Sequence, residues 1–305
     1  MIRLARLASF AALLLAAPAT AAPFVDDAYG AYQAGHYRRA QAEALKRIEA
    51  NNNDAAAMTL LGELYRQGLG IPADQKAATE WYEQAAARGD VNATFALALQ
   101  LLDEKNGKRD PARAGTLLEK AAAAGHPAAN YNLALALLAT GRPADDKRAI
   151  ASLELAAKAG VSDAMHALGI LARQGRGMPE SEEVAAGWMR KAAEAGNVPA
   201  QVEYAIMLFN GTGVAKNEAA AAKLFQHAAA QGNAVAQNRL AKLYQFGLGI
   251  APDSIEAAAW HLVARSQGLN DAALDDLFDR LNPEQRRRAG RIAASRISTT
   301  VLTAP

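Results

Sequence analysis

The sequence predicts an all-α protein, an α-solenoid in which six helix-turn-helix repeats wind into a right-handed superhelix between terminal capping helices. Three observations predict this fold: a glycine that returns every 35 or 36 residues, two alanine series with the same period, and a helix-capping side chain at a fixed place in every copy. Such a period is the signature of repeat architectures, in which each copy is one supersecondary unit.

The glycine series sets the period. Its members lie within six similar segments, such as AAARGD at 85–90 and AAAQGN at 228–233. The six glycines are Gly89, Gly125, Gly160, Gly196, Gly232 and Gly268, with spacings of 36, 35, 36, 36 and 36 residues.

Two alanine series keep this period and lie seven residues apart in each copy. They therefore share one helix face, where only a small side chain permits close helix approach. The series are Ala78, Ala114, Ala149, Ala185, Ala221 and Ala257, and Ala85, Ala121, Ala156, Ala192, Ala228 and Ala264. Trp81, Trp188 and Trp260 also share one register, which favours a packing role over a ligand site.

Each copy divides into two helices. The first carries apolar residues at i, i+4 and i+8, as in Ala57, Leu61 and Tyr65, which is a helical period. The second begins after a residue whose side chain accepts a hydrogen bond from the first free N–H groups. The six predicted caps are Asp74, Asp110, Asp145, Ser181, Asn217 and Asp253. Since no two-helix unit can bury its apolar face alone, the units must stack.

This pattern resembles the Sel1-like repeat of the tetratricopeptide-repeat superfamily, in its exported bacterial type without cysteines. The resemblance is carried by Leu61-Gly62-x-x-Tyr65, Gly68-x-Gly70-Ile71, Asp74, Ala78-x-x-Trp81-Tyr82 and Ala85-Ala86-x-x-Gly89. It implies a protein-binding scaffold, because exported proteins of this family act as adaptors or negative regulators in envelope signalling, including exopolysaccharide control.

The segments before and after the repeats are predicted to be terminal capping helices, a signal peptide and a C-terminal tail. The repeats occupy residues 54–268, and residues 22–53 resemble a tetratricopeptide unit that caps the N-terminal end. Capping helices are predicted over 269–297, where Asn282, Pro283 and Gln285 form a helix start. The remaining residues, 298–305, are predicted to be a disordered tail.

Residues 1–21 are predicted to be a cleavable signal peptide. Arg3 and Arg6 precede the apolar run LASFAALLLAA, and the small residues Ala19 and Ala21 suit cleavage after Ala21. We therefore expect a periplasmic protein with no integral membrane span after cleavage. The alternative is an uncleaved N-terminal anchor, although the apolar run is shorter than the about 20 residues that a spanning helix requires.

The Gly68-Leu69-Gly70 turn could instead grip a phosphate, as Gly-x-Gly does at some helix starts. Such loops follow a strand, whereas this one follows a helix, and no Lys-Ser/Thr pair comes after it. It also recurs at 175–177, 211–213 and 247–249. We interpret it as a structural turn whose first glycine ends the helix in a left-handed conformation.

No catalytic, cofactor or metal site is predicted, so we expect no enzyme activity. The chain has no cysteine, and its 5 histidines do not show metal-ligand spacing. Some Sel1-repeat proteins with paired cysteines are linked to β-lactam hydrolysis or binding; a hydrolase of that branch stays an alternative, but its activity does not carry over to a chain without those cysteines.

The charge of the chain gives no reason to expect a nucleic-acid partner. The formal charge is 33 − 31 = +2, and removing Arg3 and Arg6 with the signal peptide leaves 31 − 31 = 0. The basic run near the C-terminus reads as a solvated capping face, with contact to anionic lipid or polysaccharide as the alternative. Its members are Arg286, Arg287, Arg288, Arg291 and Arg296.

The first helices carry the candidate binding site. In tetratricopeptide-type solenoids these helices line the concave face, and positions equivalent to residues 59, 63 and 66 would face it. Those positions are polar in the end repeats and apolar in the middle ones. The apolar set, which predicts a groove for a partner helix or extended segment, is Phe95, Leu99, Leu102, Tyr131, Leu135, Leu138, Ile170, Ile206 and Phe209.

The sequence therefore predicts a periplasmic protein-interaction scaffold or regulator of envelope signalling, which binds an unidentified protein partner, such as an envelope sensor or assembly protein, on its concave face. Two alternatives stay open besides the hydrolase. The apolar positions could fill one another through tight curvature, and the chain could be a self-associating structural organiser of the envelope.

Overall fold

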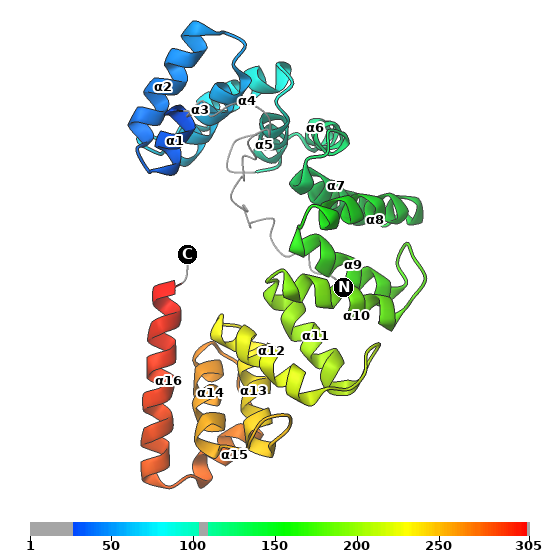
Figure 1. Ribbon diagram of the computed structural model, residues 1–305, viewed down its shortest axis with the longest axis vertical. Coiled ribbons are helices and arrows are strands. Elements are labelled where there is room, and N and C mark those ends of the chain that lie inside the picture. Colours follow the sequence, from blue (N-terminus) through cyan, green and yellow to red (C-terminus); the bar gives the residue numbers. More distant parts are fainter. Residues whose placement is uncertain (1–26, 104–108, 304–305) are drawn as a thin grey trace. The chain divides into compact units, whose positions relative to one another are not determined.

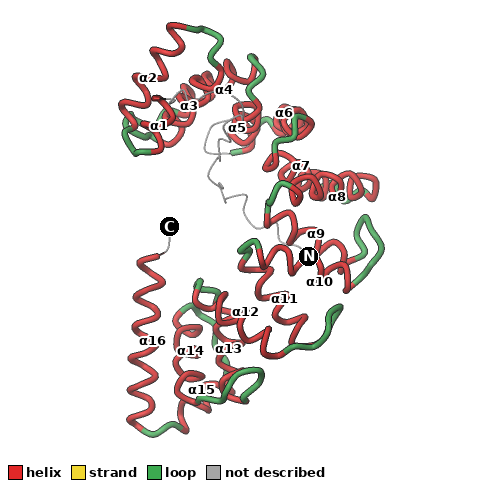
Figure 2. Tube along the Cα trace, viewed as in Figure 1, coloured by secondary structure: helices red, strands yellow, loops and turns green. Residues whose placement is uncertain are grey.

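The computed structural model describes residues 27–103 and 109–303, with side chains described up to residue 298. The predicted signal peptide at 1–21 lies outside the described residues. Within them the chain forms sixteen helices and no strand. Figures 1 and 2 show these helices and the loops that join them. The predicted all-α solenoid class is confirmed.

The helices follow one another along the chain in pairs. The N-terminal pair is α1 (Asp27–Gln33) and α2 (Tyr37–Ala50). The six repeats are α3 (Ala55–Gln67) and α4 (Gln75–Ala87), α5 (Val91–Leu102) and α6 (Pro111–Ala123), α7 (Pro127–Ala139) and α8 (Pro143–Lys158), α9 (Ser162–Gln174) and α10 (Glu182–Glu194), α11 (Val198–Asn210) and α12 (Glu218–Ala230), and α13 (Ala234–Phe246) and α14 (Ser254–Ser266). The last two helices are α15 (Ala272–Arg280) and α16 (Pro283–Thr303).

The chain divides into two compact units, residues 1–136 and 137–305, with the boundary inside α7. Within each unit most helices pack against the next helix of the chain, as α3 does on α4 and α9 on α10, whereas α16 packs on α14. The predicted alanine face lies at these contacts, because all twelve alanines of the two series are at most 1% exposed. A larger side chain there would hold neighbouring helices apart.

The turn between the two helices of a repeat is closed by backbone hydrogen bonds. Gly68, Gly175, Gly211 and Gly247 end the first helix with a left-handed conformation, as the sequence predicts. The N–H of the following cap residue then donates to a carbonyl in the last turn of the first helix, as Asn217 does to Leu208 at 2.7 Å. Asp110 keeps this bond to Leu101 at 3.0 Å, although its turn lacks Gly-x-Gly.

The second glycine of the turn touches the preceding repeat, which the sequence does not reveal. A Cβ at Gly213 would lie 2.1 Å from the carbonyl oxygen of Glu182, the first residue of α10. A Cβ at Gly249 would lie 2.2 Å from the oxygen of Glu218, the first residue of α12. Gly70 and Gly177 approach the first turns of α2 and α8 less closely: a Cβ would lie 2.9 Å from Arg38 N and 3.0 Å from the carbonyl carbon of Asp146. The second glycine therefore joins consecutive helix pairs, because a side chain at Gly213 or Gly249 would collide with the backbone of the preceding helix pair.

Five of the six predicted caps are confirmed, since Asp74, Asp110, Ser181, Asn217 and Asp253 each accept a hydrogen bond from an N–H in the first helical turn. The prediction for Asp145 is wrong. Because the turn before α8 is short, that helix starts at Pro143 and Asp145 lies inside its first turn. There its carboxylate accepts from Thr140 Oγ1 at 2.8 Å and from Arg142 Nε at 2.6 Å.

The C-terminal helix covers the last repeat. Arg296 of α16 stacks 4.0 Å above the ring of Trp260 and donates to Glu256 at 2.7 Å, both on α14. Arg296 is thus a packing residue rather than part of a solvated face, while Arg287, Arg288 and Arg291 are exposed. The predicted capping box is formed by reciprocal bonds between Asn282 and Gln285. The helix continues to Thr303, into the range for which the sequence predicts a disordered tail.

We expect the substitution Gly213→Ala to destabilise the second unit more than Gly196→Ala does. Both glycines have positive φ, which costs an alanine about 1–2 kcal/mol. Only Gly213 lacks room for a Cβ, which adds roughly 1–3 kcal/mol of forced displacement. Urea unfolding monitored by circular dichroism measures the difference, and equal losses in the two variants would contradict the inter-repeat contact.

Candidate protein-binding surface

The predicted groove residues of the first unit lie on α5 and α7. Phe95 is buried, at 4% exposure, and its ring lies 4.5 Å from the ring of His126, so Phe95 offers little surface to a partner. Leu99 and Leu102 pack on the same cluster and are half-buried. Tyr131 and Leu135 are also half-buried.

The predicted groove residues of the second unit are all half-buried, and two of them lie together. Leu138 lies in the last turn of α7, and Ile170 on α9 packs against a core cluster formed by α9, α10 and α11. Ile206 and Phe209, both on α11, line one pocket. The structure therefore brings together Phe95, Leu99 and Leu102 in one cluster and Ile206 and Phe209 in another place.

The pocket beside Ile206 and Phe209 has a volume of about 280 Å³ and is formed mainly by α11 and α13, the first helices of two consecutive repeats. We name it the α11–α13 pocket. Phe225 and Leu243 are buried in it, whereas Phe246 is 62% exposed and is the most exposed large apolar side chain of the described residues. Its lining residues are Ile206, Phe209, Asn210, Phe225, Arg239, Lys242, Leu243, Phe246 and Leu248.

Cationic side chains surround this pocket. Lys242 pairs with Asp271 at 2.6 Å, and Lys216 pairs with Glu218 at 2.8 Å while lying 5.7 Å from the centre of the Phe209 ring. Arg239 is exposed and forms no ion pair within the part of the chain that the structure describes. The α11–α13 pocket thus combines apolar walls with an unpaired positive charge.

Polar side chains at the groove positions of the first repeat form a closed network. Glu63 accepts hydrogen bonds from Arg66, Gln67 and Tyr82, with 2.6 Å to Arg66 and 2.7 Å to Tyr82. Burial alone would raise the pKa of Glu63, but these hydrogen bonds and the Arg66 charge outweigh it and hold the pKa below its ordinary value. The Glu63 carboxylate therefore binds side chains of its own repeat.

A second network lies on the first helices of the fourth and fifth repeats. Glu203 on α11 contacts His166 Nε2 at 3.1 Å and Arg173 at 2.7 Å, both on α9. Burial opposes the charge of Glu203, but the bonds and charges of His166 and Arg173 hold its pKa below the ordinary value. His166 and Arg173 are the groove positions of the fourth repeat that flank Ile170 in the sequence, so both are paired with Glu203.

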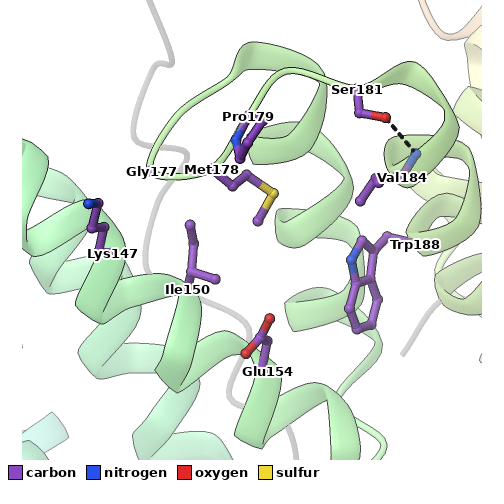
Figure 3. A pocket seen from close by; sticks show the side chains of 9 residues that line it. All are labelled: Lys147, Ile150, Glu154, Gly177, Met178, Pro179, Ser181, Val184 and Trp188. Atoms are coloured by element: carbon purple, nitrogen blue, oxygen red, sulfur yellow. Dashed lines mark hydrogen bonds between the residues drawn. The ribbon is translucent and has the colours of Figure 1, made fainter.

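A further pocket, of about 370 Å³, lies between the second helices α8 and α10. Figure 3 shows Ile150 and Glu154 on α8 facing Trp188 on α10, with the turn that carries Met178 and Pro179 above them. Trp188, predicted to be a packing residue, is half-buried here, and Lys191 lies 4.2 Å from its ring centre. Lys147 and Glu154 give this pocket one charge of each sign.

The pocket residues Phe246 and Arg239 are missing from the groove predicted from the sequence. A signal for Phe246 is nonetheless present in the repeat alignment. The other five copies have small or polar residues in this register, so a large aromatic side chain departs from the pattern; they are Gln67, Asp103, Ala139, Gln174 and Asn210. Such a departure in an otherwise regular repeat marks a candidate contact residue.

Within 27–103 and 109–303, no three His, Asp or Glu side chains gather as metal ligands would. Over the same residues, no helix joins the length and the apolar character that crossing a bilayer demands.

The Sel1 repeat family model matches six consecutive segments, 55–90, 91–126, 127–161, 162–197, 198–233 and 234–269. These segments coincide with the six helix pairs. No curated protein sequence matches the chain.

Two solved structures are similar over most of the chain. One is a protective antigen of uropathogenic Escherichia coli strains that displays an SLR fold, with 26% identity and a TM-score of 0.75 over 89% of this chain. The chain covers 61% of that antigen, which is less than two thirds of its length. The other is a Sel1 repeat protein from Oxalobacter formigenes, with 29% identity and a TM-score of 0.69 over 83% of this chain and 74% of that one.

We expect the Glu63 network to make the first unit sensitive to acid. A carboxyl whose pKa is lowered by folding stabilises the fold above its unfolded-state pKa, and this contribution is lost as pH falls through the lower folded-state pKa. The substitution Glu63→Gln keeps the side-chain shape without that titration. Its melting temperature should therefore fall less than that of the wild type as the pH drops from about 5 to 3.

Thermal unfolding by circular dichroism at stepped pH measures this effect. The control is Glu83→Gln, which removes an exposed carboxylate 2.7 Å from Arg113. Parallel pH dependence in the wild type and in Glu63→Gln would show that the network does not contribute.

Proposed function

This chain belongs to the Sel1 repeat family, and we propose that it is a periplasmic scaffold or regulator of envelope signalling that binds a partner protein on the first helices of its repeats. Sel1 repeat proteins generally mediate protein–protein interactions, so protein is the expected class of partner. The proposed role is non-enzymatic.

The exposure of Phe246 carries the proposal. Its ring is 62% exposed at the end of α13, next to Ile206 and Phe209, which the sequence assigns to the partner groove. Large aromatic side chains supply much of the binding energy of interfaces when a partner removes them from water. By contrast, the Trp260 ring of the same repeat is covered by Arg296. The repeat therefore covers one large aromatic side chain and leaves another accessible.

The periplasmic location is supported by the predicted signal peptide over 1–21. Its basic start, apolar run and small residues before position 22 are the features that export machinery reads. Regulation of envelope signalling is supported by the resemblance to exported Sel1-repeat adaptors.

Self-association is a second candidate function, favoured by the same exposed ring. If Phe246 of one chain packs on another chain, the protein forms assemblies without a second component. Sedimentation velocity across a concentration series separates the candidates, because a scaffold for a different partner stays at one sedimentation coefficient.

We expect Phe246→Glu to abolish capture of the partner, since a carboxylate replaces the apolar contact surface. The matched control is Val235→Glu, which changes another exposed apolar residue on α13, 46% exposed and outside the pocket. Affinity capture from the native envelope, followed by quantitative mass spectrometry, should show specific proteins retained by the wild type and Val235→Glu but lost by Phe246→Glu. Identical protein sets from all three baits would refute the proposed surface.

We also expect the mature protein to begin at Ala22 and to be released with the periplasmic fraction. Mass spectrometry of the purified, C-terminally tagged chain identifies its first residue. A full-length chain that sediments with membranes would favour the uncleaved anchor instead.

A further inference from the structure

We propose that the α11–α13 pocket binds an acidic protein segment that inserts one aromatic or aliphatic side chain between Phe209 and Phe246. This inference rests on the proposed protein-binding function and names the chemistry of the partner at that surface.

The size of the pocket suits a single inserted side chain. Its volume of about 280 Å³ lies below the roughly 300–1,000 Å³ of pockets that enclose small-molecule ligands. Its inner residues, Phe225 and Leu243, are buried, while Phe246 is exposed at its rim. An inserted apolar side chain would cover the exposed ring and leave no polar group of the inner pocket unpaired.

The charges at the rim select an acidic segment. Arg239 and Lys242 line the pocket, and no Asp or Glu does. Asp271 neutralises Lys242, with an N–O distance of 2.6 Å, whereas Arg239 forms no ion pair among the described residues. A partner carboxylate at Arg239 would make a charge-assisted hydrogen bond, and a partner lysine would be repelled.

The positions of Arg239 and Phe246 define the spacing within the partner. They lie seven residues apart on α13 and therefore share one face, about 10 Å apart along the helix axis. An extended chain covers that distance in about three residues. The expected segment thus carries an acidic residue about three positions from its anchor side chain.

The pocket between α8 and α10 shows no such preference for an acidic partner. Lys147 and Glu154 line it with opposite charges, so neither sign of partner is preferred.

Isothermal titration with synthetic peptides tests the inference on the full mature chain. The probe is the acetylated and amidated peptide GSFSSDDSG, and its two counterparts are GSFSSKKSG, with the charge reversed, and GSASSDDSG, without the anchor. The wild type should bind the acidic probe at least about tenfold more tightly than either counterpart, which corresponds to about 1.4 kcal/mol.

The variants locate the binding. Arg239→Glu should remove the preference for the acidic probe, and Phe246→Ala should weaken that probe by about tenfold or more. Lys223→Glu is the matched control, because Lys223 is an exposed cation on α12 that does not line the pocket. It should leave the affinity within about twofold.

The inference would be overturned if the wild type bound the acidic and basic peptides with equal affinity, or if Arg239→Glu and Lys223→Glu had equal affinity for the acidic probe. It would also be overturned by a wild-type dimer that Phe246→Ala dissociates, because a second copy of the chain would then occupy the pocket. The proposed scaffold function and the acidic specificity can be tested separately. If the captured envelope partner is lost with Phe246→Glu but kept with Arg239→Glu, the scaffold role stands and the acidic specificity does not.

Discussion

The close approach between the second glycine of each Gly-x-Gly turn and the helix start of the preceding repeat is the constraint on which the stacking depends. At Gly213 and Gly249 the neighbouring carbonyl oxygen occupies the place where a Cβ would stand. The same turns are closed by the bond from the next cap residue, as between Asn217 and Leu208. The short loop within a repeat therefore ends the first helix and starts the second. It also sets the distance to the preceding repeat. With that spacing fixed, the alanine faces can meet without room for larger side chains.

Local features of the fold could be predicted from the sequence because they depend on residues close along the chain. The cap at Asn217 and the left-handed Gly211 follow from the preferences of single residues for helix ends. The prediction for Asp145 was wrong because the repeat period places this residue at a helix cap. In the structure the turn before α8 is shorter, so the helix already starts at Pro143. The contact of Gly213 with Glu182 joins different repeats and has no local signature.

The candidate surface could be predicted only in part. Ile206 and Phe209 follow from the apolar pattern of the first helices, and both line the α11–α13 pocket. The pattern does not separate an accessible apolar residue from Phe95, which is buried beside His126. Polar groove positions are equally ambiguous in sequence: Arg173 is paired with Glu203, whereas the rim cation Arg239 has no such partner in the described residues. The regular turns thus hold similar helices in similar places, and the differences between copies decide which surface can bind.

A hydrogen-exchange footprint of the isolated partner on this chain tests the central claim most directly, since it reports which helices a partner covers without altering the protein. Our account predicts slower exchange at the ends of α11 and α13 and in the turn at Leu248, with α10 and α12 unchanged away from the pocket. Protection confined to the second helices α8 and α10 would contradict it, because the partner would then bind the opposite set of helices.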